Sequence, residues 1–337
     1  MGDSLVLTWS LHFGFVHNVF SNFLNNFMPI RLLLLIVFTA TRLLAQTTNP
    51  VVASNVAMTP ESTTVTPTKI MGAEAMVFKK VGGIELNLFV VRPKGWSASD
   101  KRPCLVSFFG GGWNGGTPER SIGYAKWAAA RGMVGVAPDY RTKNRFHTPP
   151  ENCVADGRAA VRWLQDHSAE LGIDPAKMVS LGASAGGHVA AWAAISDPVS
   201  PATATDPVPN PPPVALILLW PVTDTTMTGF AKGKPFDGDA ARAKALSVTD
   251  RMPAKMPPTI VFHGTKDALV DYSNSVAFVK KMQATGNQCS LTTFPDAPHS
   301  LTNPTPDGKG AERRRQVDQE ISKFLVDLGL VKESASK

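Results

Sequence analysis

A serine flanked by glycines lies at the centre of GASAGGH, which runs from Gly182 to His188. The pattern G-x-S-x-G is typical of a nucleophile elbow, a tight strand-to-helix turn that lifts the serine hydroxyl above a sheet. The apolar run KMVSLG precedes Ser184, and the small-residue run AGGHVAAWAAI follows it. This order favours Ser184 as a nucleophile over two alternatives, a glycine-rich structural turn and a phosphate site at a helix N-terminus.

A serine nucleophile needs a base, and the sequence contains seven histidines. In elbow-type hydrolases the chain order is nucleophile, acid, histidine, which leaves His263 and His299 as candidates. His263 ends an apolar run, whereas His299 lies in the loop sequence FPDAPHSL. Only His299 has a candidate carboxylate between it and Ser184 at another strand end. We therefore predict His299 as the base.

The acid must orient the imidazole and stabilise its protonated form. Asp267, in HGTKDALVD after a predicted strand, is the preferred candidate. Aspartate is also common in turns and at helix N-caps, which is the structural alternative for this residue. Asp271 and Asp296 are rival acids.

Donors for a developing oxyanion are predicted in FFGGGWNGG, from Phe108 to Gly116. Consecutive glycines after a strand can direct backbone N–H groups into a site without obstruction. In a loop without function, three glycines would lose conformational entropy on folding with no compensating gain. Gly111, Gly112 and Ala185 are the predicted donors. No cofactor is expected, and no cysteine has metal-site spacing.

Alternating strands and helices must position these groups. Gly82 and Gly83 separate two apolar runs and predict a leading hairpin. Beyond it, strands are predicted at 103–109, 133–141, 177–182, 214–221, 257–264 and 289–295, and helices at 121–132, 185–195 and 272–286. A further helix carries Val154, Val161, Leu164 and Leu171 at helical spacing and ends at Gly172, and the last helix places Val317, Ile321, Phe324, Leu325 and Leu328 on one face. The pattern predicts an α/β fold with a mostly parallel central sheet, antiparallel leading strands, helices on both faces and no large cap domain.

Composition fits one large globular domain or two modest ones, rather than a nucleic-acid-binding or disulfide-rich protein. The chain has 337 residues, of which 43% are hydrophobic, so it can bury a sizeable core. The net charge is +7, but basic residues are scattered and the cluster Arg313 to Arg315 has acidic neighbours, as on a solvated helix face. Three cysteines are too few for a disulfide scaffold.

The N-terminal region predicts export. Met28 to Gln46 has the layout of a secretory signal peptide with a cleavage site after Ala45. We expect residues 1–45 to be leader and signal peptide, with Met28 as an alternative start and an uncleaved membrane anchor as the alternative fate. Residues 46–69 are a predicted linker, 70–331 the catalytic domain and 332–337 a tail. A secreted or periplasmic location follows from the signal.

Six stretches together resemble the α/β-hydrolase superfamily: FFGGGWNGG, APDYR, ENCVADGRAAVRWLQDHSAELGIDPAKM, GASAGGH, PPTIVFHGTKDALV and PDAPHSL. More narrowly, the chain is similar from Met71 to Leu330 to secreted carboxylesterases and acetyl xylan or feruloyl esterases related to the hormone-sensitive-lipase group. The resemblance implies Ser184 as nucleophile, Asp267 as acid and His299 as base. It also implies a glycine oxyanion loop at Gly110 to Gly112.

Two departures from that group matter. Phe109 stands where the H-G-G-G motif has histidine, so any loop-positioning role of that histidine is lost. Backbone donors do not depend on the side chain, so activity should survive. Without a large cap, an open site suits soluble or polymer-borne esters. Trp113, Asn114 and Tyr140 are expected to border the substrate pocket, although aromatic residues at strand ends are often core.

The sequence therefore predicts a serine esterase for short-chain carboxylic esters, with acetyl or feruloyl groups on carbohydrate as candidate substrates. The alternatives are a prolyl-oligopeptidase-like serine peptidase and an inactive binding protein. A peptidase of that type usually carries a propeller domain, for which the segment before the first strand leaves no room. All three catalytic positions are occupied, which disfavours an inactive protein. The expected partner is a small-molecule or carbohydrate-borne ester, not nucleic acid.

Overall fold

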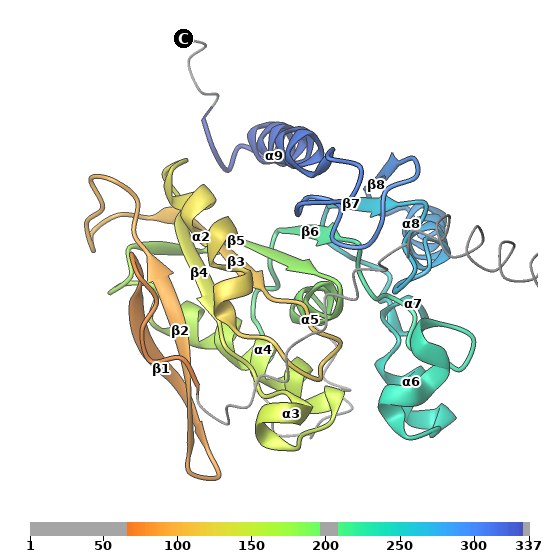
Figure 1. The fold of residues 1–337 in the computed structure, drawn as a ribbon. Coiled ribbons are helices and arrows are strands. Elements are labelled where there is room, and N and C mark those ends of the chain that lie inside the picture. The colour runs from red at the N-terminus through yellow and green to blue at the C-terminus, as the bar shows by residue number, and fades with distance from the viewer. Residues whose placement is uncertain (1–65, 196–207, 333–337) are drawn as a thin grey trace, which may run out of the picture. The chain divides into compact units, whose positions relative to one another are not determined.

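The computed structural model describes residues 66–195 and 208–332, drawn in colour in Figure 1. The predicted leader and signal, most of the predicted linker and nearly all of the tail lie outside the described residues. Among the helices of the described ranges, none has the length and apolar character needed to cross a bilayer.

Eight strands in the described ranges form one sheet, in the spatial order β1-β2-β4-β3-β5-β6-β7-β8. They are β1 (Glu74–Val81), β2 (Ile84–Val91), β3 (Arg102–Phe108), β4 (Val134–Pro138), β5 (Ile173–Ala183), β6 (Ala215–Leu219), β7 (Thr259–Gly264) and β8 (Cys289–Phe294). β1 pairs with β2, and β2 with β4, in antiparallel orientation. The pairings from β4 across to β8 are parallel. The predicted α/β fold, with a mostly parallel sheet and antiparallel leading strands, is confirmed.

Helices cover both faces of this sheet (Figure 1). The longer ones are α2 (Ile122–Ala129), α4 (Pro150–Asp166), α5 (Ala185–Ala193), α8 (Ser273–Ala284) and α9 (Gly310–Asp327). Helix α9 begins at Gly310, before Val317, the first of the apolar positions predicted on one face, because its first turns carry charged residues that show no apolar periodicity. The helices alternate with strands along the chain, so the carboxyl ends of the parallel strands share one edge of the sheet.

Alternating side chains of the strands build two apolar layers. On β3, Val106 belongs to the layer packed under α4, α5 and α8, while Leu105 belongs to the layer under α2 and α9. All five residues of β6, ALILL, are buried. A strand covered on both faces must be apolar throughout, which is why the central strands read as continuous apolar runs in the sequence.

Short helices occur where none was predicted. They are η1 (Pro118–Arg120), α3 (Lys143–Phe146), η2 (Phe230–Phe236), α6 (Ala240–Leu246) and α7 (Val248–Arg251). The last three fill the connection between β6 and β7, which the sequence indicated only as a polar stretch. Side-chain caps stabilise two of them: Asp239 accepts from the N–H groups of Ala241 and Arg242, and Ser247 accepts from that of Asp250. Each is too short to show helical periodicity.

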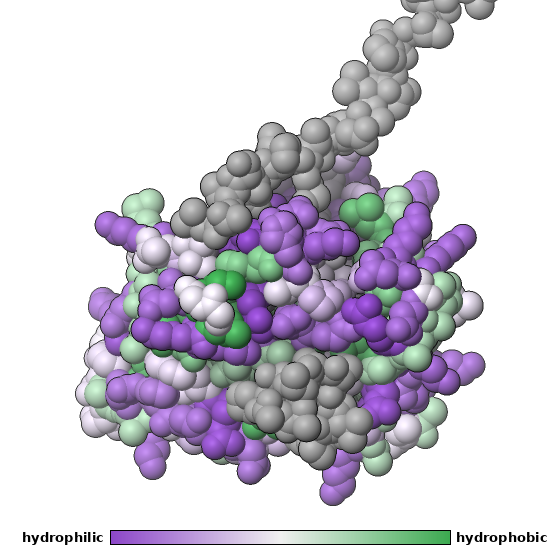
Figure 2. All heavy atoms as spheres, turned by 90° about the horizontal axis from the view of Figure 1, so that it is seen from below, coloured by the Kyte–Doolittle hydropathy of each residue, from purple (hydrophilic) through white to green (hydrophobic). Residues whose placement is uncertain are grey.

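The lower face of the molecule is shown in Figure 2. Its visible part is mainly hydrophilic, with apolar side chains gathered in small groups between polar ones. Broad apolar patches mark surfaces that bind lipid or protein partners. On the visible part of this face, polar side chains separate the apolar groups.

Candidate active site

Ser184 lies in the turn between β5, which ends at Ala183, and α5, which begins at Ala185. Its backbone has φ 56° and ψ −125°, a conformation that costs a non-glycine residue about 1–3 kcal/mol. Two backbone hydrogen bonds hold it there. The Ser184 N–H donates to the carbonyl of Leu219 (2.9 Å), and the Ser184 carbonyl accepts from the N–H of Val222 (3.2 Å). The end of β6 thus enforces the strained turn.

Two glycines permit the turn to pack as closely as it does. A Cβ at Gly182 would lie 2.1 Å from the carbonyl oxygen of Gly186. A Cβ at Gly186 would lie 2.2 Å from the carbonyl oxygen of Phe109. Real Cβ atoms do not approach backbone oxygens so closely, so both positions require glycine. The helix after the nucleophile is consequently packed directly against the loop that follows β3.

The structure brings Ser184, His299 and Asp267 into one hydrogen-bonded chain. Nε2 of His299 lies 3.1 Å from Oγ of Ser184, and Nδ1 of His299 lies 2.7 Å from Oδ2 of Asp267. A carboxylate only accepts, so Nδ1 carries the proton and Nε2 is free to accept from the serine hydroxyl. Asp267 follows β7 and His299 follows β8, so parallel neighbouring strands deliver both to the sheet edge where Ser184 lies.

The rival acids lie elsewhere. Asp271 is exposed and accepts from the N–H of Ser273 at 2.8 Å. Asp296 is exposed and pairs with Lys266 at 3.0 Å. The carboxylate that hydrogen-bonds to His299 belongs to Asp267.

Four donors surround the buried carboxylate of Asp267. Oδ1 accepts from the N–H groups of Leu269 and Val270, each at 2.9 Å. Oδ2 accepts from His299 and from Nε2 of His263, the latter at 3.1 Å. Burial on its own would raise the pKa of Asp267, but the hydrogen bonds from His263, His299 and the backbone outweigh it and hold that pKa below its usual value. The group is therefore a carboxylate at neutral pH.

Sequence reasoning missed His263 as a partner of Asp267. It set His263 aside because no carboxylate lay at a strand end before it. The available signal was the i, i+4 spacing of the two residues in HGTKD, at the end of a buried strand. That spacing brings them together because the loop after β7 turns back on the strand.

The predicted oxyanion donors Gly111 and Gly112 follow β3. Their φ angles are 147° and 61°, in the region that favours glycine. The Gly111 carbonyl accepts from the N–H groups of Asn114 (3.1 Å) and Gly115 (3.2 Å), which folds the loop into a tight turn. A Cβ at neighbouring Gly110 would lie 3.1 Å from Cβ of Ser184, so the loop contacts the nucleophile's own side chain. Ala185, the third predicted donor, begins α5.

Tyr140 does not border the pocket as predicted. It is completely buried, its ring stacks on Phe109, and its hydroxyl donates to the Phe109 carbonyl. Its own carbonyl accepts from Nη2 of Arg145 (2.9 Å), and Arg145 also pairs with buried Asp139 (2.6 Å). Burial raises the pKa of Asp139 to about 6, although Arg145 opposes this rise. Tyr140 is thus part of a buried support for the glycine loop.

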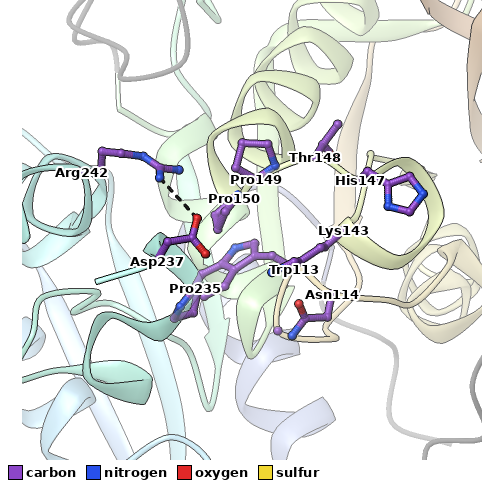
Figure 3. Close-up of a pocket in the computed structure, with 11 residues that line it drawn as sticks. Trp113, Asn114, Lys143, His147, Thr148, Pro149, Pro150, Pro235, Asp237 and Arg242 are labelled. Carbon is purple, nitrogen blue, oxygen red and sulfur yellow. Dashed lines mark ion pairs between the residues drawn. The ribbon is translucent and has the colours of Figure 1, made fainter. Parts of the chain in front are cut away.

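A cavity of about 320 Å³ lies beside this loop (Figure 3). Residues from the loop after β3, from α3 and the segment after it, and from the η2–α6 region line it: Gly112, Trp113, Asn114, Lys143, His147, Thr148, Pro149, Pro150, Pro235, Asp237 and Arg242. Trp113 and Asn114, predicted as pocket residues, are both in its wall. The indole Nε1 of Trp113 is buried and has no hydrogen-bond partner among the described residues. The exposed polar part of the cavity wall comes instead from side chains such as Asn114 and Thr148.

The cysteines and other potential metal ligands are dispersed in the described part of the chain. No group of three or more His, Cys, Asp or Glu side chains in these ranges could hold a metal ion. Cys104 and Cys153 are free and completely buried, and burial raises the pKa of each thiol. Both are unreactive core residues.

Comparisons with known proteins agree with this geometry. Residues 91–205 match the family model BD-FAE. Esterase LipQ of Mycobacterium tuberculosis is 26% identical over 266 residues, which cover 72% of this chain and 60% of LipQ. Carboxylesterase NlhH of the same species is 28% identical over 229 residues, covering 60% of this chain and 68% of NlhH. This chain thus spans less than two thirds of the length of LipQ.

A solved structure gives a more complete match. Esterase 2 of Thermogutta terrifontis, phosphoramylated by tabun, is 34% identical with a TM-score of 0.70, and the alignment covers 80% of this chain and 99% of that one. Identity at this level over almost the whole of a solved esterase, together with the shared fold, establishes the family. The chain belongs to the α/β-hydrolase superfamily, among the carboxylic ester hydrolases of the hormone-sensitive-lipase group.

Proposed function

We propose that this protein is a serine esterase that hydrolyses short-chain carboxylic esters through an acyl-enzyme intermediate. The observation that carries the proposal is the hydrogen-bonded chain from Ser184 through His299 to Asp267, with distances of 3.1 and 2.7 Å. Support also comes from esterase 2 of Thermogutta terrifontis, which has been solved with propionate and with butyrate bound. Its modification by tabun is consistent with an activated nucleophile in that relative.

In the first step, Oγ of Ser184 attacks the ester carbonyl carbon while Nε2 of His299 takes the hydroxyl proton. The carbonyl oxygen gains the negative charge, and the N–H groups of Gly111, Gly112 and Ala185 are the proposed donors to it. Asp267 stabilises the protonated imidazole through Nδ1–H. The C–O bond to the alcohol then breaks, and His299 returns the proton to the leaving alcohol.

The second step repeats this chemistry with water. His299 takes a proton from a water molecule, whose oxygen attacks the acyl carbon bound to Ser184. The tetrahedral intermediate uses the same backbone donors. Its collapse breaks the bond to Oγ, returns the proton from His299 to Ser184, and releases the carboxylic acid.

For the substrate, we propose an ester of a short acyl group on a carbohydrate or a comparable polar alcohol, with acetyl or feruloyl as candidate acyl groups. The cavity beside Gly112 supports this choice, because Pro149, Pro150 and Pro235 provide apolar planes next to polar Asn114 and Thr148. Sugar rings present both apolar faces and hydroxyl groups, and such walls suit them. Export through the signal at residues 28–46 remains a proposal from sequence; it would bring the enzyme to polymer-borne esters.

The test is hydrolysis of 4-nitrophenyl esters from acetate to palmitate, run beside acetylated xylan and proline-peptide amides. We expect rates that fall steeply with acyl length, together with release of acetate from xylan. Activity on the amides alone would favour the peptidase, and no activity on any substrate would favour a binding protein.

A fluorophosphonate probe tests the nucleophile directly. Wild-type protein should be labelled and Ser184→Ala should not, with unchanged thermal unfolding. Ser322→Ala, on α9, is the matched control and should label as wild type does. Normal turnover in Ser184→Ala would overturn the assignment.

A further inference from the structure

We propose that His263 is a positioning residue of the reaction: its Nε2–H fixes the Asp267 carboxylate in the orientation that His299 requires. This inference rests on the proposed esterase function. It adds a second histidine behind the acid, one that touches neither substrate nor nucleophile.

Hydrogen-bond partners determine how His263 is protonated. Nε2 lies 3.1 Å from Oδ2 of Asp267 and 3.0 Å from the carbonyl oxygen of Val270. Neither oxygen can donate, because one belongs to an ionised carboxylate and the other to a peptide group. Nε2 must therefore carry the proton and donate to both. On the other side of the ring, Nδ1 lies 2.7 Å from Oγ of Ser275, whose hydroxyl can donate to it.

The carboxylate of Asp267 is locked as a consequence. His263 and His299 both donate to Oδ2, while two backbone N–H groups donate to Oδ1. Rotation of the carboxylate about its Cβ–Cγ bond would break all four hydrogen bonds at once. Without His263, Oδ2 would keep His299 as its only side-chain donor among the described residues, and that donor is the group whose position matters for catalysis.

His263 is placed to act only through Asp267. It is completely buried at the end of β7, so substrate cannot reach it. Its other ring neighbour is Tyr272, which approaches edge-on with centroids 5.7 Å apart. The carboxylate of Asp271 also interacts electrostatically with His263.

Three variants separate this role from simple core packing. His263→Leu removes the donor but keeps an apolar side chain, and we expect kcat for 4-nitrophenyl acetate to fall about 100-fold with KM changed less than about twofold. In His263→Gln the side-chain amide can donate from nearly the position of Nε2, and kcat should recover by about tenfold relative to His263→Leu. Phe262→Leu is the matched control, because it shrinks a buried side chain on the opposite face of the same strand. It should lower thermal stability without changing kcat.

The pH profile distinguishes positioning from stability. The bond from His263 withdraws negative charge from Asp267, so its loss strengthens the attraction of this carboxylate for protonated His299. The acidic limb of kcat/KM should therefore move to higher pH in His263→Leu and stay in place in Phe262→Leu. Wild-type kcat and an unshifted profile in a folded His263→Leu variant would refute the positioning role while leaving the esterase proposal intact.

A measurement on the wild-type protein covers the case in which His263→Leu does not fold. Nitrogen-15 NMR of histidine side chains reports which ring nitrogen bears the proton. We expect the Nε2–H form for His263 and the Nδ1–H form for His299. An Nδ1–H form for His263 would overturn the proposal, whereas a wild-type protein without ester hydrolysis would overturn the proposed function instead.

Discussion

The ring of Tyr140 lies flat against the ring of Phe109, with centroids 3.9 Å apart and an interplanar angle of 4°. The Tyr140 hydroxyl also donates to the carbonyl of Phe109, the residue immediately before the glycine loop. Phe109 occupies the position at which the resemblance to the H-G-G-G motif implies a histidine. In this protein the start of the loop is anchored by stacking and by a buried backbone hydrogen bond instead of that side chain.

Tyr140→Phe tests this anchor. The substitution keeps the stacked ring but leaves the buried Phe109 carbonyl without its donor, which costs about 1–3 kcal/mol. We expect the glycine loop to loosen and kcat for 4-nitrophenyl acetate to fall about tenfold. Tyr124→Phe is the control, because Tyr124 is also buried but lies on α2 away from the loop. Equal activity in the two variants would show that the hydroxyl of Tyr140 does not support the loop.

Gly186→Ala tests the close approach of α5 to the same loop. The added Cβ would lie 2.2 Å from the Phe109 carbonyl oxygen, so helix and loop must separate. We expect a loss of about 3 kcal/mol in the free energy of unfolding and a fall of about 100-fold in kcat.

Gly123 provides the matched control for Gly186→Ala. At Gly123, in α2, no atom lies within 4 Å of an added Cβ. Gly123→Ala should therefore be stabilising by about 0.5–1 kcal/mol, as measured by urea unfolding. A stable, fully active Gly186→Ala variant would contradict the packing described here.

Buried His188 should make the protein less stable toward unfolding as the pH falls. Burial lowers its pKa from 6.5 to about 4. Between these values the unfolded chain binds a proton that the folded protein does not, so stability falls as the pH falls through this window. The contribution is about 3 kcal/mol over the full window. His188→Gln, whose amide can still donate to the Leu246 carbonyl, should unfold with a weaker pH dependence between pH 6.5 and about 4. Urea unfolding across this range checks it, and identical slopes in the two proteins would count against the assignment.

Helix α4 carries two aspartates that should respond very differently to replacement. Asp156 is completely buried and pairs with Arg141 (2.7 Å) and Lys79 (2.8 Å). Asp156→Asn removes the carboxylate that faces buried Arg141 and half-buried Lys79, and it should lower the free energy of unfolding by about 3–5 kcal/mol. Asp166 pairs with Arg162 on the surface, and Asp166→Asn should change stability by less than about 1 kcal/mol. Thermal unfolding of both variants measures the two changes in stability. Similar losses of stability would show that burial does not determine how much each ion pair stabilises the fold.

The sequence predicted the fold best where burial produces a recognisable pattern of apolar residues. The central strands are covered on both faces, so continuous apolar runs such as ALILL in β6 can be recognised as strands in the sequence. The order of nucleophile, acid and histidine then restricted the choice of partners for Ser184, and the structure brings those three residues together.

The features that the sequence did not predict depend on contacts between distant segments. Helices α6 and α7 are held by single side-chain caps and tertiary packing, and neither is long enough to show a periodic apolar face. Phe109 follows β3 and Tyr140 follows β4, so their stacking has no local signature in the sequence. The bond between His263 and Asp267 requires the loop after β7 to curl back, which the sequence pattern alone does not specify.

The three groups of the proposed mechanism leave the ribosome at very different times. His299 follows Ser184 by 115 positions and comes after β8, the last strand of the sheet. A nascent chain therefore displays its elbow serine while the histidine that would activate it has not yet been synthesised. A polypeptide released before that point has a nucleophile without a base. Unfinished chains are thus inert toward the esters of the cell that makes them.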